Sequence, residues 1–153
     1  MPNPATPKDA EFILQLYDLR REAEMRKARS FIGGEFWPES IADLEKLMAD
    51  MRSPQNAWFR QVTSFWDMAA SLVLHGCIHE QLFVENANEM FFIYAKMRPL
   101  LKDFREKFET PDFMANSEKV IQRTPEARAK AEFFEKRITR FRARVAAAKA
   151  HAN

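Results

Sequence analysis

Glycine is scarce in this sequence, with three residues among 153, at positions 33, 34 and 76. A G-x-G-x-x-G dinucleotide turn or a Walker-type phosphate loop needs clustered glycines, because the backbone must approach the phosphates closely. Neither motif is present. Scarce glycine, together with 46% hydrophobic and 30% charged residues, is typical of a folded, helix-rich globular protein.

The sequence has one cysteine, and its apolar runs are shorter than a transmembrane helix requires. A single cysteine, Cys77, cannot form an intramolecular disulfide. The first residues, "MPNPATPKD", lack the apolar stretch of a signal peptide. No apolar run approaches the roughly 20 residues that span a bilayer. We therefore predict a cytoplasmic protein without a transmembrane segment.

Familiar catalytic motifs are also missing. The esterase motif G-x-S-x-G does not occur, and no glutamate lies three residues before a histidine, as a di-iron bundle requires. Glu85 and Glu89 have the spacing of one helix face and are a candidate acid and base pair, although a solvated acidic face is the favoured interpretation. The sequence predicts no cofactor and no enzymatic activity.

Helix starts are marked by hydroxyl residues that stand before prolines. Serine and threonine cap helix N-termini well, and proline is favoured in the first helical position. Four such pairs occur: Thr6-Pro7, Ser53-Pro54, Thr110-Pro111 and Thr124-Pro125. A fifth start is expected at Ser40, where Asp43 imitates a capping box.

Apolar periodicity agrees with these starts and shows no strand pattern. The expected helices span about residues 7–30, 40–51, 54–75, 80–97, a short segment after 111, and 125–150, with a kink or restart at Pro99. The helix over 54–75 has the widest apolar face and should be central. We predict an all-α, single-domain bundle over residues 1–153, with about five to six helices and a long basic C-terminal helix.

The stretch "LHGCIHEQLF", residues 74–83, contains three possible zinc ligands, His75, Cys77 and His79. A structural zinc site normally has four ligands, and only Glu80 is near enough in sequence to be the fourth. Gly76 stands where a helix would end in the left-handed conformation that glycine tolerates. The sequence favours a turn between two helices, with metal binding as the weaker alternative.

The last helix has an apolar seam that steps by four and three residues, as in a coiled coil. It runs through Ala127, Ala131, Phe134, Ile138, Phe141, Val145 and Ala148. Residues 125–153 contain eight Lys or Arg and three Glu, a net charge of +5, which leaves −3 for the rest of a chain whose total is +2. We expect the helix over 54–75, or a second subunit, to cover this seam.

Three functional hypotheses follow. The first is a non-enzymatic interaction or scaffold module that self-associates as a homo-oligomer, with interface residues Phe134, Ile138, Phe141 and Val145. The second is a small-molecule binder with an apolar pocket between helices. The third is an enzyme that uses carboxylates or a metal. The basic helix also allows weak contact with a polyanion or membrane surface, but no motif for sequence-specific nucleic-acid recognition is present.

One part of the chain resembles a known pattern. The segments "SPQNAWFRQVTSFWDMAASLVLHGCIHEQLF" and "MFFIYAKMRPLLKDFREKF" resemble a family of uncharacterised bacterial all-helical proteins with a domain of unknown function. The matching positions are Ser53-Pro54, Gly76, Ile78, Glu80, Tyr94, Pro99 and Arg105. The resemblance covers about residues 52–108 and implies a helical fold. Such proteins often begin with an apolar membrane helix, which is not found here.

Overall fold

The computed structural model describes residues 3–152, and all regular secondary structure in that range is α-helical. The predicted fold class is therefore confirmed. Eight helices are present in the described range, rather than about five to six: α1 Pro7–Leu19, α2 Ala23–Gly34, α3 Ile41–Ala49, α4 Pro54–Leu74, α5 Glu80–Asn86, α6 Asn88–Lys107, α7 Ala115–Arg123 and α8 Pro125–His151.

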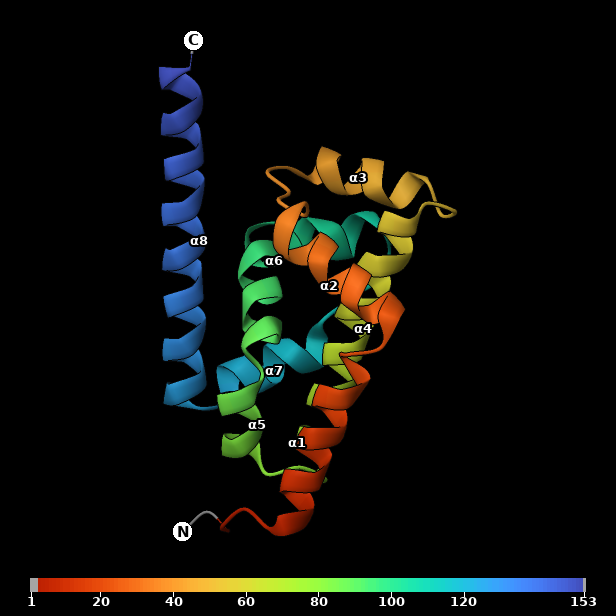
Figure 1. The fold of residues 1–153 in the computed structure, drawn as a ribbon, viewed down its shortest axis with the longest axis vertical. Helices are drawn as coiled ribbons and strands as arrows, with labels where there is room; N and C mark the ends of the chain where they lie inside the picture. Colours follow the sequence, from red (N-terminus) through yellow and green to blue (C-terminus); the bar gives the residue numbers. More distant parts are fainter. Residues whose placement is uncertain (1–2, 153) are drawn as a thin grey trace.

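Helix α4 is central, as its wide apolar face predicted. It contacts α2, α3, α5, α6 and α7, and α2 packs along much of its length. Figure 1 shows α8 at one side of the molecule, with its C-terminal half extending past the end of α6, and the two chain ends far apart. Within residues 3–152, none of the helices combines the length and the apolar character needed to span a bilayer.

Most of the predicted caps are confirmed. The side chains of Thr6, Ser53 and Thr124 each accept a hydrogen bond from a backbone N–H in the first turn, and a proline follows each of them. Ser40 and Asp43 form a complete capping box at the start of α3. These starts depend only on neighbouring residues, so the sequence alone is enough to place them.

The start predicted at Thr110-Pro111 is wrong. Residues 111–114 form turns, and α7 begins only after Met114, which has a left-handed backbone (φ 55°) and no capping side chain. The cap comes from α4 instead, where Asp67 Oδ1 accepts hydrogen bonds from Ser117 N (2.8 Å) and Ser117 Oγ (3.0 Å). A distant carboxylate thus replaces the local hydroxyl, and α7 starts where that carboxylate lies.

The single helix predicted over residues 7–30 is two helices. The chain bends between Leu19 and Ala23, where neither glycine nor proline occurs. Glu22 caps α2 through a hydrogen bond from Met25 N to its carboxylate (2.9 Å). The bend lets α1 contact α5 while α2 follows α4. Tertiary packing, which periodicity does not report, decides this break.

The helix predicted over residues 80–97 also divides, at Ala87. From α8, Lys130 Nζ donates hydrogen bonds to the carbonyl oxygens of Val84 (2.5 Å) and Glu85 (3.3 Å), which lie in the last turn of α5. The kink or restart expected at Pro99 does not occur as a helix boundary, because α6 is continuous from Asn88 to Lys107. Buried side chains on both sides of Pro99 hold the helix together despite one missing backbone bond.

Of the two covers expected for the α8 seam, the one within the chain, the helix over 54–75, is wrong, and the second subunit stays a prediction. Helix α8 packs on α6 and α7, and not mainly on α4 as the sequence suggested. Helix α4 is already enclosed by α2 and α7, so its apolar face is occupied. The buried residues of α8 lie in its first half, and are Ala127, Ala131, Phe134 and Ile138.

Candidate functional site

The stretch around Gly76 is a helix-ending turn. Gly76 has a φ of 72°, and its N–H donates to Val73 O (2.9 Å), while Cys77 N donates to Leu72 O (2.8 Å). These two hydrogen bonds form a Schellman motif, which satisfies the last carbonyls of α4. Ile78 is buried beside it. The turn predicted from the glycine is present.

The three candidate metal ligands have other surroundings. His75 Nδ1 lies 2.8 Å from Ser71 O. His79 caps α5, since its Nδ1 accepts from Leu82 N (3.2 Å) and its Nε2 lies 2.8 Å from Asn3 O. Cys77 is exposed. Over residues 3–152 the structure shows no group of three His, Cys, Asp or Glu side chains placed to hold a metal.

The first half of the α8 seam is covered within the chain. Phe134 stacks on Phe91 of α6, with ring centroids 6.3 Å apart. Ile138 is 4% exposed. On the flank of α8, Glu135 accepts two hydrogen bonds from Arg98 of α6, at 2.6 and 2.7 Å. These two predicted interface residues therefore complete the core of their own chain.

The second half of the seam is open. Phe141 is 46% exposed and Val145 is 38% exposed. This half contacts the body where the Phe141 ring stacks on Trp37, in the loop between α2 and α3, with ring centroids 4.5 Å apart. Arg142 adds a hydrogen bond to Pro38 O (2.7 Å). A groove of about 560 Å³ lies here, and its lining includes Trp37, Phe141, Val145 and, at its edges, Glu39, Arg142 and Lys149. We call it the α8 groove.

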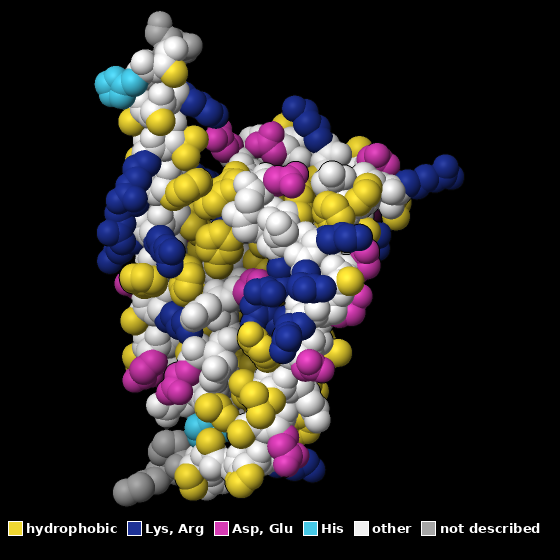
Figure 2. Space-filling view, in the orientation of Figure 1, with side chains coloured by type: hydrophobic (Ala, Val, Ile, Leu, Met, Phe, Trp, Pro, Cys, Tyr) yellow, Lys and Arg dark blue, Asp and Glu magenta, His cyan; other side chains and the backbone are white. Residues whose placement is uncertain are grey.

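Positive charge gathers on the same half of α8. Residues 136–151 include six Lys or Arg and no Asp or Glu. None of the six forms an ion pair with a carboxylate in the described part of the chain. Figure 2 shows hydrophobic side chains in the hollow between α8 and the body, and Lys and Arg side chains along the outer edge of α8.

A fully buried lysine lies behind the α8 groove. Lys96 Nζ donates to the carbonyl oxygens of Ile32 (2.6 Å) and Phe36 (2.7 Å), and it sits 3.6 Å from the centroid of the Trp37 ring. Burial, with a contribution from the charge of Arg142, lowers the pKa of Lys96 to about 7. Lys96 thus fixes the end of α2 and the ring on which α8 rests. The sequence did not predict this role of Lys96, because the helix that contains it has ordinary apolar spacing.

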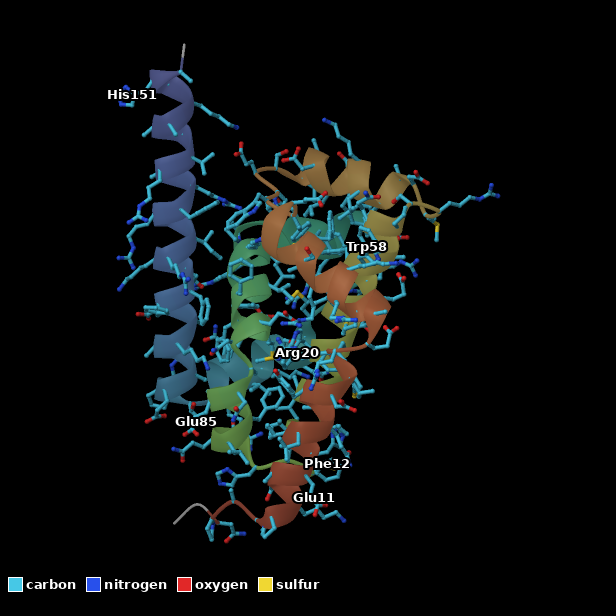
Figure 3. The ribbon with its side chains drawn as sticks, viewed as in Figure 1. Glu11, Phe12, Arg20, Trp58, Glu85 and His151 are labelled. Carbon is cyan, nitrogen blue, oxygen red and sulfur yellow. The ribbon has the colours of Figure 1, made fainter. Side chains whose placement is uncertain are left out.

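A second buried charged site is centred on Glu89. The sequence did not predict it, because its members are far apart in the chain. Glu89 accepts hydrogen bonds from Arg29 Nε (2.6 Å), Arg20 Nη2 (3.3 Å) and Trp66 Nε1 (3.0 Å). The candidate acid and base pair of Glu85 and Glu89 is wrong, since the break at Ala87 places them on different helices. The favoured interpretation, a solvated acidic face, is also wrong for Glu89, whose side chain is only 13% exposed. Figure 3 shows Arg20 near the middle of the molecule and Glu85 on the side that faces α8.

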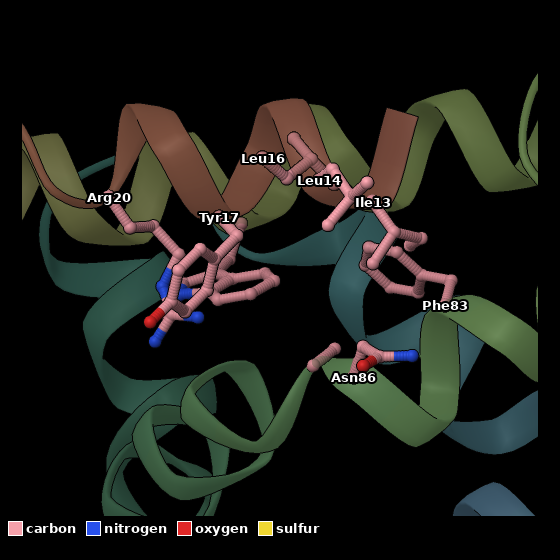
Figure 4. Close-up of a pocket in the computed structure, with 9 residues that line it drawn as sticks. Ile13, Leu14, Leu16, Tyr17, Arg20, Phe83 and Asn86 are labelled. Carbon is pink, nitrogen blue, oxygen red and sulfur yellow. The ribbon is translucent and has the colours of Figure 1, made fainter. Parts of the chain in front are cut away.

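An apolar pocket of about 260 Å³ adjoins this cluster. It lies between α1, α4 and the end of α5, and Figure 4 shows Arg20 and Tyr17 lining one end, with Ile13 and Phe83 lining the other. Asn86 also lines it, and the Nδ2 of Asn86 donates to Leu82 O (2.8 Å). We call it the α1 pocket. It joins an apolar surface to one guanidinium group.

The chain belongs to the family described as Domain of unknown function (DUF4760), whose model matches residues 5–124. The resemblance to a domain-of-unknown-function family drawn from residues 52–108 is confirmed. No curated protein and no solved structure matches the chain. The family match ends at Thr124, the residue that caps α8, so it includes the α1 pocket and leaves α8 outside.

Proposed function

We propose that this protein is a non-enzymatic interaction module whose α8 groove binds an acidic amphipathic helix of a partner protein. The observation that carries the proposal is the groove itself, where Phe141 and Val145 remain partly exposed beside cations that have no carboxylate partner in the described structure. Burial of apolar side chains on binding contributes affinity, and charged residues at the rim of the groove select the partner.

The positive charge of α8 favours an acidic partner over a second copy of this chain. The six cations of residues 136–151 would face one another if two such segments paired directly, and like charges at an interface oppose association. An acidic helix would neutralise them. Self-association, which the sequence led us to expect, is therefore the competing occupant of the groove, and the test below separates it from an acidic partner. The cytoplasmic location and the absence of catalysis stay predictions within this proposal.

The direction of the apolar side chains favours a protein helix over a polyanion or a membrane. Phe141 and Val145 line the groove between α8 and the body, where a flat bilayer does not reach them. A nucleic acid would use exposed cations that do not line the groove, such as Lys136, Arg140 and Arg144, and it would leave the groove empty. A helix is narrow enough to lie in the groove and contact both features.

The test uses the full chain and a set of labelled synthetic helical peptides, with leucine at the heptad a and d positions. One set has glutamate at the remaining charged positions, and the matched set has lysine. We expect fluorescence anisotropy to show binding of the glutamate set only, weakening as salt is added. Failure of every glutamate peptide to bind, or equal binding of both sets, would overturn the proposal.

Variants assign the binding to the groove. Val145→Asp and Lys149→Glu should each weaken binding of the glutamate peptide by about tenfold or more, since both residues line the groove and would place acidic groups where the peptide docks. Met51→Asp is the matched control, because Met51 is an exposed apolar residue (72%) at another place, and it should bind normally. A dimer in light scattering that Val145→Asp dissolves would replace the acidic partner with a second copy. Duplex DNA that outcompetes the peptide would replace it with a polyanion.

A further inference from the structure

The α1 pocket combines features that a structural crevice does not require. Leu14 and Tyr17 on its α1 wall are 66% and 57% exposed, although both carry large apolar groups. The opposite wall includes Phe83, which is 1% exposed and is held firmly in the core. A ligand in the pocket would therefore cover exposed apolar surface on α1 against a fixed wall.

The charge at one end of the pocket is unbalanced. Arg20 and Arg29 share one carboxylate, Glu89, so the three side chains together carry a net charge of +1. The side chains of Arg20 and Glu89 are only 14% and 13% exposed, so water screens this excess charge poorly. A single negative charge would neutralise the group, whereas a dianion would leave an excess of negative charge.

Arg20 has donors to spare and is held in position. Within the described structure only its Nη2 has a hydrogen-bond partner, and its buried Nε has none. Its guanidinium lies over the Trp66 ring, 5.1 Å from the centroid. Because a guanidinium presents its N–H groups in a planar fork, an oriented arginine suits a carboxylate.

We propose that the α1 pocket binds a small monocarboxylate with an apolar body. The carboxylate pairs with Arg20, and the hydrocarbon part lies between Ile13, Leu16 and Phe83. The volume of about 260 Å³ limits the ligand to a short aliphatic chain or one ring. The pocket is separate from the α8 groove and lies inside the region that the family model matches. This site is therefore independent of the function proposed for α8.

The probe is sodium octanoate, compared with the neutral 1-octanol, both below the concentration at which they aggregate. Titrations followed by methyl NMR report on Ile13 and Leu16, and calorimetry gives the dissociation constants. We expect octanoate to bind more tightly than octanol by about tenfold or more, because a charge-assisted hydrogen bond contributes only for the carboxylate. Equal affinities, or no shift at these methyl groups, would overturn the proposal.

Three variants locate the charge and the cavity. Arg20→Met should bring octanoate down to the affinity of octanol, while Arg21→Met, an exposed arginine in the same turn, should leave both unchanged. If Arg20→Met unfolds, Ile13→Trp serves instead, because it fills the apolar end and should abolish both ligands without touching the guanidinium. Octanoate affinity that survives Ile13→Trp, or that falls equally with Arg21→Met, would contradict the assignment.

Discussion

The two halves of α8 carry the same apolar repeat but lie in different surroundings. In the first half, Phe134 and Ile138 are buried against α6, and Glu135 pairs with Arg98. In the second half, Phe141 and Val145 face a groove that only Trp37 partly fills. An apolar period therefore tells which face of a helix avoids water, and it does not tell what covers that face.

Charge separates the two halves where the apolar period does not. All three glutamates of α8 lie before Lys136, in the half that packs on the body, whereas the second half has only cations. The first half thus has local partners for charge and core. The second half has no Asp or Glu of its own and keeps Phe141 and Val145 partly exposed, and this difference is the reason to expect a partner there.

The largest effect should come from a charge in the covered half. We expect Ile138→Asp to lower the free energy of unfolding by about 4 kcal/mol, because it buries a carboxylate without a partner. Val145→Asp, in the open half, should cost less than about 1 kcal/mol. Urea denaturation at two protein concentrations measures both. Similar losses of unfolding free energy for the two variants would contradict the distinction between the halves. A urea midpoint that depends on protein concentration would show that another copy covers the seam.

A smaller effect should come from Lys96, the buried cation behind the open half. Its folded pKa of about 7 lies below the ordinary value of 10.5, so the unfolded chain binds more protons between these values. Stability should therefore rise with pH in this window, by about 1–2 kcal/mol from pH 7 to 9. Denaturation curves of Lys96→Met should lose this rise. A wild-type curve that is flat or falls over the same range would contradict the expectation.

The smallest effects distinguish two arginines of the open half. Arg142 is half-buried and bonded to Pro38 O, so Arg142→Gln should cost about 1 kcal/mol. Arg144 is exposed, and Arg144→Gln should cost less than about 0.5 kcal/mol. Thermal melts under identical conditions compare them. Equal melting temperatures would mean that the Pro38 contact does not hold α8 to the body.

Local signals predicted the fold class and the starts of α1, α3, α4 and α8. Thr6, Ser40, Ser53 and Thr124 act on backbone groups within their own turn, and Gly76 ends α4 through a conformation that its missing side chain permits. The breaks near Arg20 and Ala87 were not predictable in this way. The break at Ala87 coincides with hydrogen bonds from Lys130 of α8, and the bend near Arg20 lets α1 pack on α5 and α2 on α4. No local window contains these distant contacts.

The candidate sites also divide into features that the sequence predicted and features that depend on the tertiary structure. The apolar and basic character of α8 follows from its own residues. The same spacing identified Phe141 and Val145 as members of the seam. An apolar pocket between helices was one of the hypotheses, but the place of the α1 pocket was not predicted, because Arg20, Glu89 and Phe83 come together from distant parts of the chain.

The sequence by itself determined that this chain is helical, where four of its helices begin, and that its last helix is basic with one apolar face. These properties follow from features of neighbouring residues, namely capping side chains, apolar periodicity and the scarcity of glycine. The tertiary structure decided that α6 and α7 cover the first half of that face, and that Arg20 and Glu89 meet beside a pocket. Burial and charge pairing between distant residues depend on how the helices cross, which the linear order does not contain.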